Sequence, residues 1–366
     1  MKADPLIVEH ATILALAAPR QLTYLELPLP PIGEADVVVQ TLYSGISHGT
    51  EMNVYRGLAP QLSEYFEPVL RLFLPVSQTV QPQPPGRGYW KPSDSNWGYP
   101  LAYGYANVGR VVECGNSVTS LKKGDLVYAF EPHQNYYVAP AASVIRLPEL
   151  QNPAEGIFYA NMNTAYNGVL DAGIHIDDVV VIFGLGVVGL LVTQFARRTA
   201  AQKIVVVDPM PERRLLGLQM GADIALAPEE VDVAKAVREM TNGRGADVVI
   251  EVSGSYAALH EAIRTAAYNT TVTAMSWYGG NGEALRLANE FHHNRISIRS
   301  SQVGGMAPEL SATHDIVRRG KNVIAAFTSL QLSPLLTHYV PFTAASDGYA
   351  LVDRRDASVL QVVLEY

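Results

Sequence analysis

The stretch 179–208 reads VVVIFGLGVVGLLVTQFARRTAAQKIVVVD and decides the fold. An apolar run ends at the glycine-rich turn 184–189, a helical run follows to about residue 200, and a second apolar run ends at Asp208. The order of strand, glycine turn, helix, strand and acid is typical of a dinucleotide-binding βαβ unit. The stretch therefore predicts a Rossmann domain, in which helices cover both faces of a doubly wound parallel sheet.

The three glycines of the turn have different expected roles. Gly184 permits the tight turn, Gly186 lets the backbone approach a pyrophosphate, and Gly189 lets the helix pack closely on the strand. The helix N-terminus offers free N–H groups and a positive dipole end to the phosphates. We therefore predict a cofactor-binding turn made of Gly184, Leu185, Gly186, Val187, Val188 and Gly189.

The acid at the end of the second strand indicates which dinucleotide binds. Asp208 is placed to accept hydrogen bonds from the adenosine ribose hydroxyls, and its carboxylate would repel a ribose 2′-phosphate. NAD(H) is therefore the predicted cofactor. Because Arg213 and Arg214 follow shortly after Asp208, NADP(H) stays open as the alternative.

The composition limits the class of protein. A length of 366 residues suggests two domains, and 48% hydrophobic residues allow a sizeable core. The net charge of −8 and the lack of a basic run argue against a nucleic-acid partner. No apolar run reaches membrane-spanning length, and the first twenty residues lack the basic region of a signal peptide. We expect a cytoplasmic protein with a small-molecule substrate and no membrane partner.

The chain divides by the period of its apolar residues. Short strand signals dominate residues 1–155, strand–helix alternation follows over 156–303, and the tail 304–366 carries a helix and a final strand. Alternation predicts a parallel sheet, whereas the first part predicts a β-rich domain. Residues 58–100 form an insert rich in proline and aromatics. This insert is either a hydrophobic cluster that covers the domain or a lid over a substrate pocket.

The order of these parts resembles the medium-chain dehydrogenase/reductase family over nearly the whole chain. The loop 45–51, the pair Gly104-Tyr105, the segment 124–127, the glycine fingerprint and the tail carry the resemblance. It implies a GroES-like catalytic domain (1–155), a Rossmann NAD-binding domain (156–303) and a C-terminal return to the catalytic domain (304–366). The loop 44–51, SGISHGTE, and the segment 108–113, VGRVVE, are similar to those of bacteriochlorophyllide hydroxyethyl dehydrogenases.

The resemblance also implies where a catalytic zinc would bind, and there the sequence departs from the family. Ser47 stands in the place of a cysteine ligand, Tyr105 lies in the triplet that aligns with the second ligand segment, and the third position falls near Ala160. Serine, tyrosine and alanine are a poor ligand set for Zn²⁺. No cysteine follows Cys114, so the four-cysteine structural zinc lobe is absent too. A member without zinc is therefore predicted.

Without a metal, hydrogen-bond donors and a proton relay must manage the charge on the substrate oxygen. Tyr105 either donates to that oxygen or fills the empty metal site. Ser47 and Thr50 either relay a proton or cap turns. His48 resembles a basic residue that contacts the cofactor pyrophosphate, with titration in a relay as the alternative. Glu51 resembles a structural residue that holds the loop, with a general base as the alternative.

Three further residues are expected near the cofactor, besides Arg213, which resembles a basic residue beside the adenosine ribose. Ser253 and Ser276 follow strands of the parallel sheet, whose carboxyl ends should face the nicotinamide half. Thr164 precedes the fingerprint, where the family lines the site near the nicotinamide, and helix capping is the alternative. The resemblance further implies a homodimer that forms through the sheet edge near residues 295–301.

Together these features predict an NAD(H)-dependent, zinc-independent oxidoreductase. Its expected substrate is a secondary alcohol or ketone of a bulky molecule that is cyclic, sugar-like or planar. One alternative is an enoyl or quinone reductase that acts on an activated C=C bond. Another is a dinucleotide-binding sensor without turnover.

Overall fold

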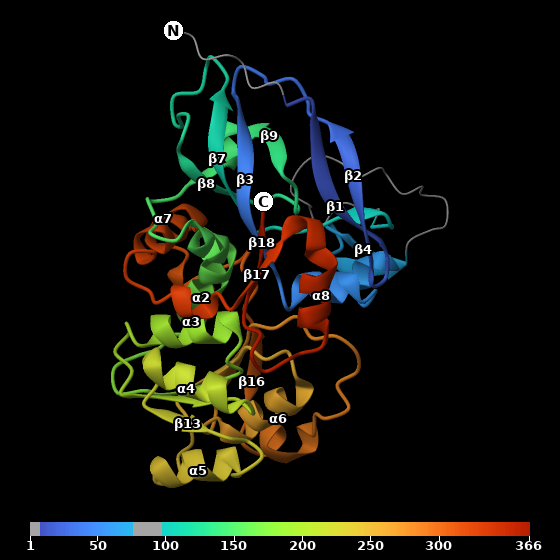
Figure 1. The fold of residues 1–366 in the computed structure, drawn as a ribbon. Helices are drawn as coiled ribbons and strands as arrows, with labels where there is room; N and C mark the ends of the chain where they lie inside the picture. Colours follow the sequence, from blue (N-terminus) through green and yellow to red (C-terminus); the bar gives the residue numbers. More distant parts are fainter. Residues whose placement is uncertain (1–7, 76–96) are drawn as a thin grey trace. The chain divides into compact units, whose positions relative to one another are not determined.

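The structure, a computed structural model, describes residues 8–75 and 97–366. The chain forms two compact units: unit 1 comprises Met1–Tyr159 and Leu332–Tyr366, and unit 2 comprises Ala160–Gln331. Unit 1 is β-rich and unit 2 is built on a parallel sheet (Figure 1), which confirms the predicted fold class. The sequence analysis predicts that the chain returns to the first domain at residue 304. In the structure, the chain rejoins unit 1 at Leu332.

Unit 1 is organised around β3, which pairs with β7, β9 and β18 in a seven-stranded sheet. A second sheet has the order β2-β1-β6. The elements of unit 1 are β1 (His10–Ala18), β2 (Gln21–Pro28), β3 (Asp36–Ile46), α1 (Thr50–Tyr55), β4 (Glu64–Glu67), β5 (Leu72–Pro75), β6 (Leu101–Ala102), β7 (Asn107–Cys114), β8 (Leu126–Ala129), β9 (Tyr136–Pro140), β10 (Ile145–Arg146), β17 (His338–Pro341), α8 (Ala345–Asp353) and β18 (Val362–Glu365).

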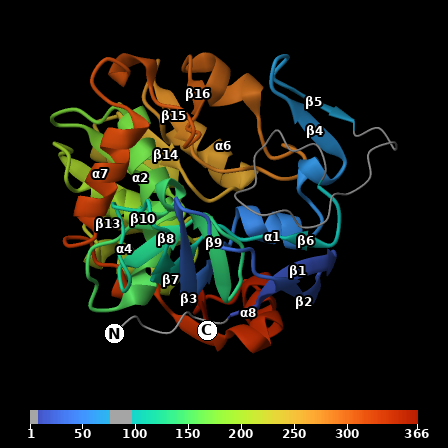
Figure 2. The ribbon, with the colours of Figure 1, turned by 90° about the horizontal axis from the view of Figure 1, so that it is seen from above.

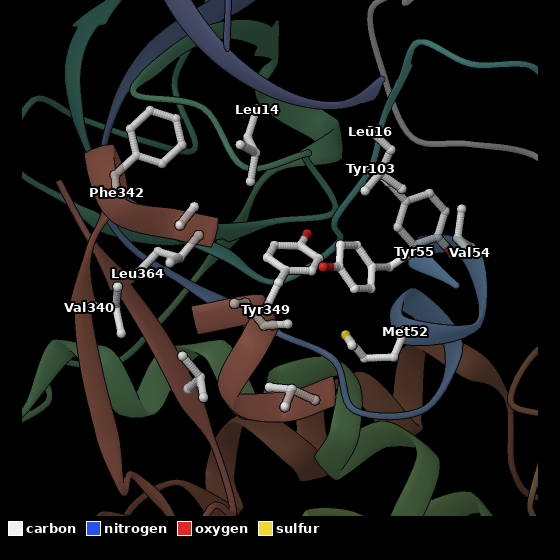
Figure 3. Close-up of a cluster of buried hydrophobic side chains, with 14 of the residues drawn as sticks. Leu14, Leu16, Met52, Val54, Tyr55, Tyr103, Val340, Phe342, Tyr349 and Leu364 are labelled. Carbon is white, nitrogen blue, oxygen red and sulfur yellow. The ribbon is translucent and has the colours of Figure 1, made fainter. Parts of the chain in front are cut away.

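The chain's end completes this unit. β18 pairs antiparallel with β3 and parallel with β17, and α8 covers a hydrophobic cluster that also contains side chains of β1 and α1. Figure 3 shows Tyr349 of α8 beside Tyr55 of α1, with ring centroids 5.0 Å apart. Both ends of the sequence therefore build one core, as the resemblance implies.

Unit 2 contains a six-stranded parallel sheet of order β13-β12-β11-β14-β15-β16. The order reverses direction at β11, so right-handed crossovers place helices on both faces. Its elements are α2 (Tyr159–Ala172), β11 (Val179–Phe183), α3 (Val187–Ala196), β12 (Lys203–Val207), α4 (Pro211–Gln219), β13 (Ile224–Leu226), α5 (Val233–Met240), β14 (Val248–Glu251), α6 (Tyr256–Thr265), β15 (Thr271–Ala274), β16 (Ser297–Ser300) and α7 (Ile316–Ala326).

A buried polar network explains why α7 belongs to unit 2. Arg319 of α7 donates to Asn167 Oδ1 at 2.6 Å, and Asn322 donates to the Tyr166 hydroxyl at 2.9 Å, so α7 lies beside α2 (Figures 1 and 2). Asp171 accepts from Asn167 and Ser301. The bonds of Arg319 with Asn167, of Asn322 with Tyr166 and of Ser301 with Asp171 each join residues more than a hundred positions apart. Local sequence patterns therefore could not reveal them.

The insert 58–100 is described up to residue 75 and again from residue 97. β4 and β5 form an antiparallel hairpin (Figure 2). The rings of Phe66 and Phe73 contact each other across it. At the other end of the insert, Trp97 is buried in the hydrophobic cluster that α8 covers. The Tyr99 hydroxyl donates to the carbonyl of Val54 at 2.7 Å. The described end therefore covers the core, as the first interpretation expects, while residues 76–96, with Tyr89 and Trp90, lie outside the described residues. In the described part of the chain, no helix is both long and apolar enough to cross a membrane.

Candidate active site

Two hydroxyl groups meet in unit 1 at positions where the resembling family places metal ligands. Ser47 directly follows β3, and Tyr105 lies in the loop that leads into β7. The Tyr105 hydroxyl donates a hydrogen bond to Ser47 Oγ at 2.5 Å. The carbonyl of Tyr105 accepts from the hydroxyl of Tyr128 on β8, which fixes the loop to the sheet. The structure thus brings together two of the predicted catalytic residues.

The other residues of the glycine-rich loop differ in their surroundings. His48 and Thr50 are half-buried, and Thr50 begins α1. Glu51 is fully buried in the first turn of that helix. The Glu51 Oε2 atom accepts from the backbone N–H of Ser47 at 2.9 Å. A carboxylate with no exposed surface that bonds the loop backbone favours the loop-holding interpretation over the general base.

The other carboxylate oxygen of Glu51 begins a row of buried hydrogen bonds. Glu51 Oε1 is 2.8 Å from His133 Nε2 and also accepts from the Tyr349 hydroxyl. His133 Nδ1 is 2.6 Å from Ser44 Oγ, which lies 2.8 Å from the Tyr366 hydroxyl. Because the carboxylate accepts, the network assigns the ring proton to Nε2, so that Nδ1 accepts from Ser44. We call Ser44, Glu51, His133, Tyr349 and Tyr366 the buried clamp.

The two phenols of the buried clamp act as donors. Burial raises the pKa of Tyr349 well above its usual value, and the Glu51 charge and the hydrogen bond to it raise the pKa further. Burial also raises the pKa of Tyr366, although the hydrogen bond with Ser44 opposes the rise. Both phenols therefore stay protonated at neutral pH, so Tyr349 donates a second hydrogen bond to Glu51 Oε1 and Tyr366 donates to Ser44 Oγ.

The glycine turn of unit 2 has a geometry that only glycine permits at two positions. Gly184 has φ +93°, in the left-handed region. A Cβ on Gly189 would stand 1.9 Å from the carbonyl oxygen of Gly184, so this glycine allows α3 to approach the turn itself. At Gly186, which caps α3 without a side-chain hydrogen bond, an added Cβ would meet nothing within 4 Å. The turn therefore leaves open space at the position predicted to face a pyrophosphate.

Asp208 joins this turn to the next helix. It is 4% exposed, and its two carboxylate oxygens accept from the backbone N–H groups of Leu185 at 2.7 Å and Met210 at 2.9 Å. Arg214 donates to the carbonyls of Asp208 and Pro209 and pairs with Glu229. Its guanidinium is thus engaged by the protein, whereas Arg213 lies half-buried on α4.

Polar side chains gather at the carboxyl end of β14. Glu251 accepts from the backbone N–H of Ser253 at 2.7 Å and from the hydroxyls of Ser253, Tyr278 and Ser276. Burial raises the pKa of Glu251, while these hydrogen bonds oppose the rise. The Cβ of Ser253 is 2.7 Å from where a Cβ of Gly184 would be, so this cluster packs directly on the glycine turn. Ser253 and Ser276 thus meet as the sheet topology predicts.

Thr164 lies inside α2, and its predicted place near the nicotinamide stays a prediction. The Thr164 hydroxyl donates to the carbonyl of Ala160 at 3.1 Å, one turn earlier in α2, so it does not cap a helix. Sequence reasoning gave no role in the site to Ser44, His133, Tyr349 or Tyr366. His133 follows Glu131-Pro132 in a turn and carries no motif; its contacts with Ser44 and Glu51 join segments 89 and 82 positions apart.

The chain is similar in sequence to several dehydrogenases. The profile of the zinc-binding dehydrogenase family matches residues 187–318. D-guloside 3-dehydrogenase of Escherichia coli K12 is 30% identical over 291 residues, which cover 78% of this chain and 79% of that enzyme. L-threonine 3-dehydrogenase of Symbiobacterium thermophilum is 26% identical over 87% of this chain and 88% of that enzyme.

Solved structures share the fold at low identity. An Escherichia coli oxidoreductase/dehydrogenase of unknown specificity, involved in membrane biogenesis, superposes with a TM-score of 0.76 at 17% identity, covering 97% of this chain and 99% of that one. A proposed zinc-binding dehydrogenase from Sinorhizobium meliloti 1021, bound to NADP, gives 0.74 at 18% identity over 98% and 100%. The resemblance to bacteriochlorophyllide dehydrogenases stays a prediction.

Proposed function

The chain belongs to the medium-chain dehydrogenase/reductase superfamily of oxidoreductases, and on that premise we propose that it transfers hydride between NAD(H) and a secondary alcohol or ketone without zinc. The observation that carries the proposal is the hydrogen bond from Tyr105 to Ser47, at positions where relatives place metal ligands. The predicted dinucleotide turn belongs to unit 2, and the hydroxyl pair belongs to unit 1.

The hydroxyl pair offers a proton for the substrate oxygen. When a ketone is reduced, its carbon gains a hydride from C4 of NADH, which becomes NAD⁺, and its oxygen gains a proton. Because Tyr105 donates to Ser47 Oγ, the Ser47 hydrogen is free to point to the substrate oxygen and to leave with it, and the Tyr105 proton replaces it. Solvent then returns a proton to Tyr105. Oxidation of the alcohol runs through the same groups in reverse.

The side chains at the aligned metal positions do not fit zinc. Ser47 and Tyr105 supply neutral hydroxyls, and Ala160 supplies no ligand atom. The nearby carboxylate and imidazole, Glu51 and His133, are 0% and 1% exposed and hydrogen-bonded to each other. Over residues 8–75 and 97–366, no three His, Cys, Asp or Glu side chains group closely enough to hold a metal ion. The proposed reaction therefore uses no metal.

Two features support NAD(H) over NADP(H). The Asp208 carboxylate would repel a 2′-phosphate, and the neighbouring Arg214 guanidinium already binds two carbonyls and Glu229. The Sinorhizobium meliloti structure contains NADP. The preference of this chain for NADH over NADPH is therefore measured directly in the experiment below. The similarity to D-guloside 3-dehydrogenase supports a sugar-like secondary alcohol as the substrate, within the wider class of bulky substrates.

One set of measurements tests the proposal. NADH and NADPH are titrated by fluorescence, zinc is measured on the same sample, and sugar glycosides, cyclitols, planar ketones, enones and quinones are screened as substrates. We expect tighter binding of NADH, no stoichiometric zinc and turnover of a secondary alcohol or ketone. Tighter binding of NADPH would overturn the role of Asp208, and stoichiometric zinc would overturn the metal-free reaction. NADH binding without turnover on any class would favour a sensor.

Variants then test the hydroxyl pair. Ser47→Ala removes the donor nearest the substrate oxygen, and Tyr105→Phe removes the group behind it. Because such donors contribute about 10²- to 10³-fold to kcat, we expect a loss of that size for Ser47→Ala and a smaller loss for Tyr105→Phe. Affinity for NADH should be unchanged in both, since the glycine turn is in unit 2. Wild-type kcat in Ser47→Ala would rule out this mechanism.

A further inference from the structure

The buried clamp extends the proposed function and rests on it. We propose that His133 and Tyr349 are positioning residues, which hold Glu51 and through it aim the Ser47 hydroxyl at the substrate. Neither residue touches the substrate, because both are at most 1% exposed. In a reaction without metal, His133 and Tyr349 would thus set the geometry of the hydroxyl pair Ser47 and Tyr105.

The first step of the argument is the contact between Glu51 and the catalytic loop. Glu51 Oε2 binds the backbone N–H of Ser47, the residue whose side chain accepts from Tyr105. The position of the Glu51 carboxylate therefore fixes the peptide from which the Ser47 hydroxyl projects. A carboxylate in this interior stays in place only while its other lone pairs are satisfied.

The second step is the origin of the donors on Glu51 Oε1. His133 comes from the turn before β9, and Tyr349 comes from α8 in the C-terminal return. Figure 3 shows Tyr349 projecting from α8 into the core, where its ring lies beside that of Tyr55 on α1. Two segments distant in sequence thus converge on one oxygen. Ser44 and Tyr366 fix the ring of His133 from its other nitrogen.

The third step links His133 to the second hydroxyl of the pair. Gly104, which precedes Tyr105, has φ +128° and lies against His133: a Cβ there would be 3.0 Å from His133 Cδ2 and 3.1 Å from His133 Nε2. The backbone N–H of His133 also donates to the carbonyl of Tyr103. His133 therefore contacts the loop of Tyr105 directly and the loop of Ser47 through Glu51, so it sets the position of both hydroxyls.

Hydride transfer depends steeply on this geometry. A misplacement of about 1 Å can cost about 10²-fold in rate, even when the change is remote from the reacting atoms. Tyr349→Phe deletes one donor to Glu51 and leaves ring packing in place. We expect kcat to fall about 10-fold or more, with the affinity for NADH unchanged.

A matched control separates positioning from packing. The Tyr24 hydroxyl also binds the C-terminal return, donating to the carbonyl of Phe342 at 2.5 Å and accepting from the N–H of Ala345 at 3.3 Å, and neither bond involves Glu51. Tyr24→Phe therefore removes a hydroxyl of β2 that binds the same return, and it keeps every hydrogen bond of the buried clamp. It should leave kcat within about twofold of wild type.

The experiment measures the full-length protein with NADH, and a second readout does not need turnover. Hydrogen–deuterium exchange follows the peptide 44–51, which holds the Ser47 amide bound to Glu51. We expect faster exchange there in Tyr349→Phe and wild-type exchange in Tyr24→Phe. His133→Gln, which keeps a side-chain donor, should recover more kcat than His133→Ala.

The outcomes distinguish the two proposals. If the wild-type protein turns over no alcohol or ketone, the proposed function fails, and exchange at 44–51 still decides the clamp. If exchange in Tyr349→Phe equals that of wild type, the positioning role is overturned whatever the activity. An active enzyme in which Tyr349→Phe and Tyr24→Phe have equal kcat overturns it as well.

Discussion

Glu131 shows how a single carboxyl group makes stability depend on pH. It lies two residues before His133 and, with Gln134 and Tyr137, lines a cavity of about 740 Å³. Burial raises the pKa of Glu131 to about 7, although a 3.0 Å hydrogen bond from Gln134 opposes the rise. The folded protein therefore holds this proton over a range of pH in which the unfolded chain, with a pKa near 4.3, has lost it.

We predict that Glu131→Gln stabilises the protein at alkaline pH only. Because the folded pKa is raised, the contribution of Glu131 to stability is fully present below about pH 4 and is lost as the pH rises through about 7. The neutral glutamine avoids this loss, so the variant should gain about 1–3 kcal/mol at pH 8 and little at pH 4.5. Thermal unfolding at the two values measures the difference.

Exposed Glu149 provides the comparison, since its side chain is 80% exposed. Glu149→Gln should change the melting temperature little at either pH. If Glu131→Gln also leaves the melting temperature unchanged at pH 8, then ionisation of Glu131 does not destabilise the folded protein, and the prediction is wrong.

Single residues were predictable from sequence only where a local pattern marked them. Ser47 and Tyr105 stood out because a known motif predicts a cysteine and a histidine there, and the structure joins them by a hydrogen bond. His133 and Tyr349 gave no such signal. Their significance comes from contacts with Glu51 that close loops of 82 and 298 residues, and only the tertiary fold creates those contacts.

At the scale of elements, periodicity predicted the sheet strands well. β11 and β12 were expected as the two apolar runs on either side of the glycine turn and its helix. They end at Phe183 and Val207, directly before the turn and before Asp208, because buried strands give continuous apolar runs. The helix after the glycine turn ends at Ala196 rather than near residue 200. The final strand begins at Val362, since residues 359–361 are bound to Thr337 and Asp356 instead of a strand partner.

The glycine turn permits a prediction that separates folding from binding. A Cβ at Gly186 meets no protein atom within 4 Å, whereas a Cβ at Gly189 would stand 1.9 Å from the carbonyl oxygen of Gly184. Gly186→Ala should therefore keep the wild-type melting temperature within a few degrees but weaken NADH binding by about 10-fold or more, because the methyl group occupies space proposed for the pyrophosphate. Gly189→Ala should unfold at a much lower temperature.

Fluorescence titration with NADH and thermal unfolding of both variants test this prediction. Wild-type NADH affinity in Gly186→Ala would place the phosphates away from the turn. A stable Gly189→Ala would mean that α3 can move away from Gly184, contrary to the close approach of the two segments in the structure.

At the scale of the whole molecule, the sequence predicted the classes of the two domains but not all of their boundaries. The Rossmann pattern is local, so a single stretch was enough to predict the parallel sheet of unit 2. The return of the chain to unit 1 is a tertiary event. It starts at Leu332, after α7, which Arg319 joins to the rest of unit 2 through hydrogen bonds to Asn167 and the carbonyl of Val303.

The predicted homodimer has its interface at the edge of the unit 2 sheet, near residues 295–301. The exposure of this edge supports the prediction. β16 is an edge strand with all four residues exposed. The backbone N–H groups of Ser297 and Ser301 donate inward, to Thr270 and Ala274. Residues alternate along a strand, so the N–H groups of Ile298 and Ser300 point to the free edge, where a second copy could pair.

We therefore expect the protein to have about twice its chain mass of 39.7 kDa in light scattering. Ser300→Pro deletes one outward N–H and places a ring at the edge, while the inward bonds of β16 are kept, so it should shift the protein to the monomer. Ser300→Ala keeps the N–H and should stay dimeric, which separates the backbone effect from loss of the hydroxyl. A monomeric wild type would refute pairing, and a dimeric Ser300→Pro would place the interface on another surface.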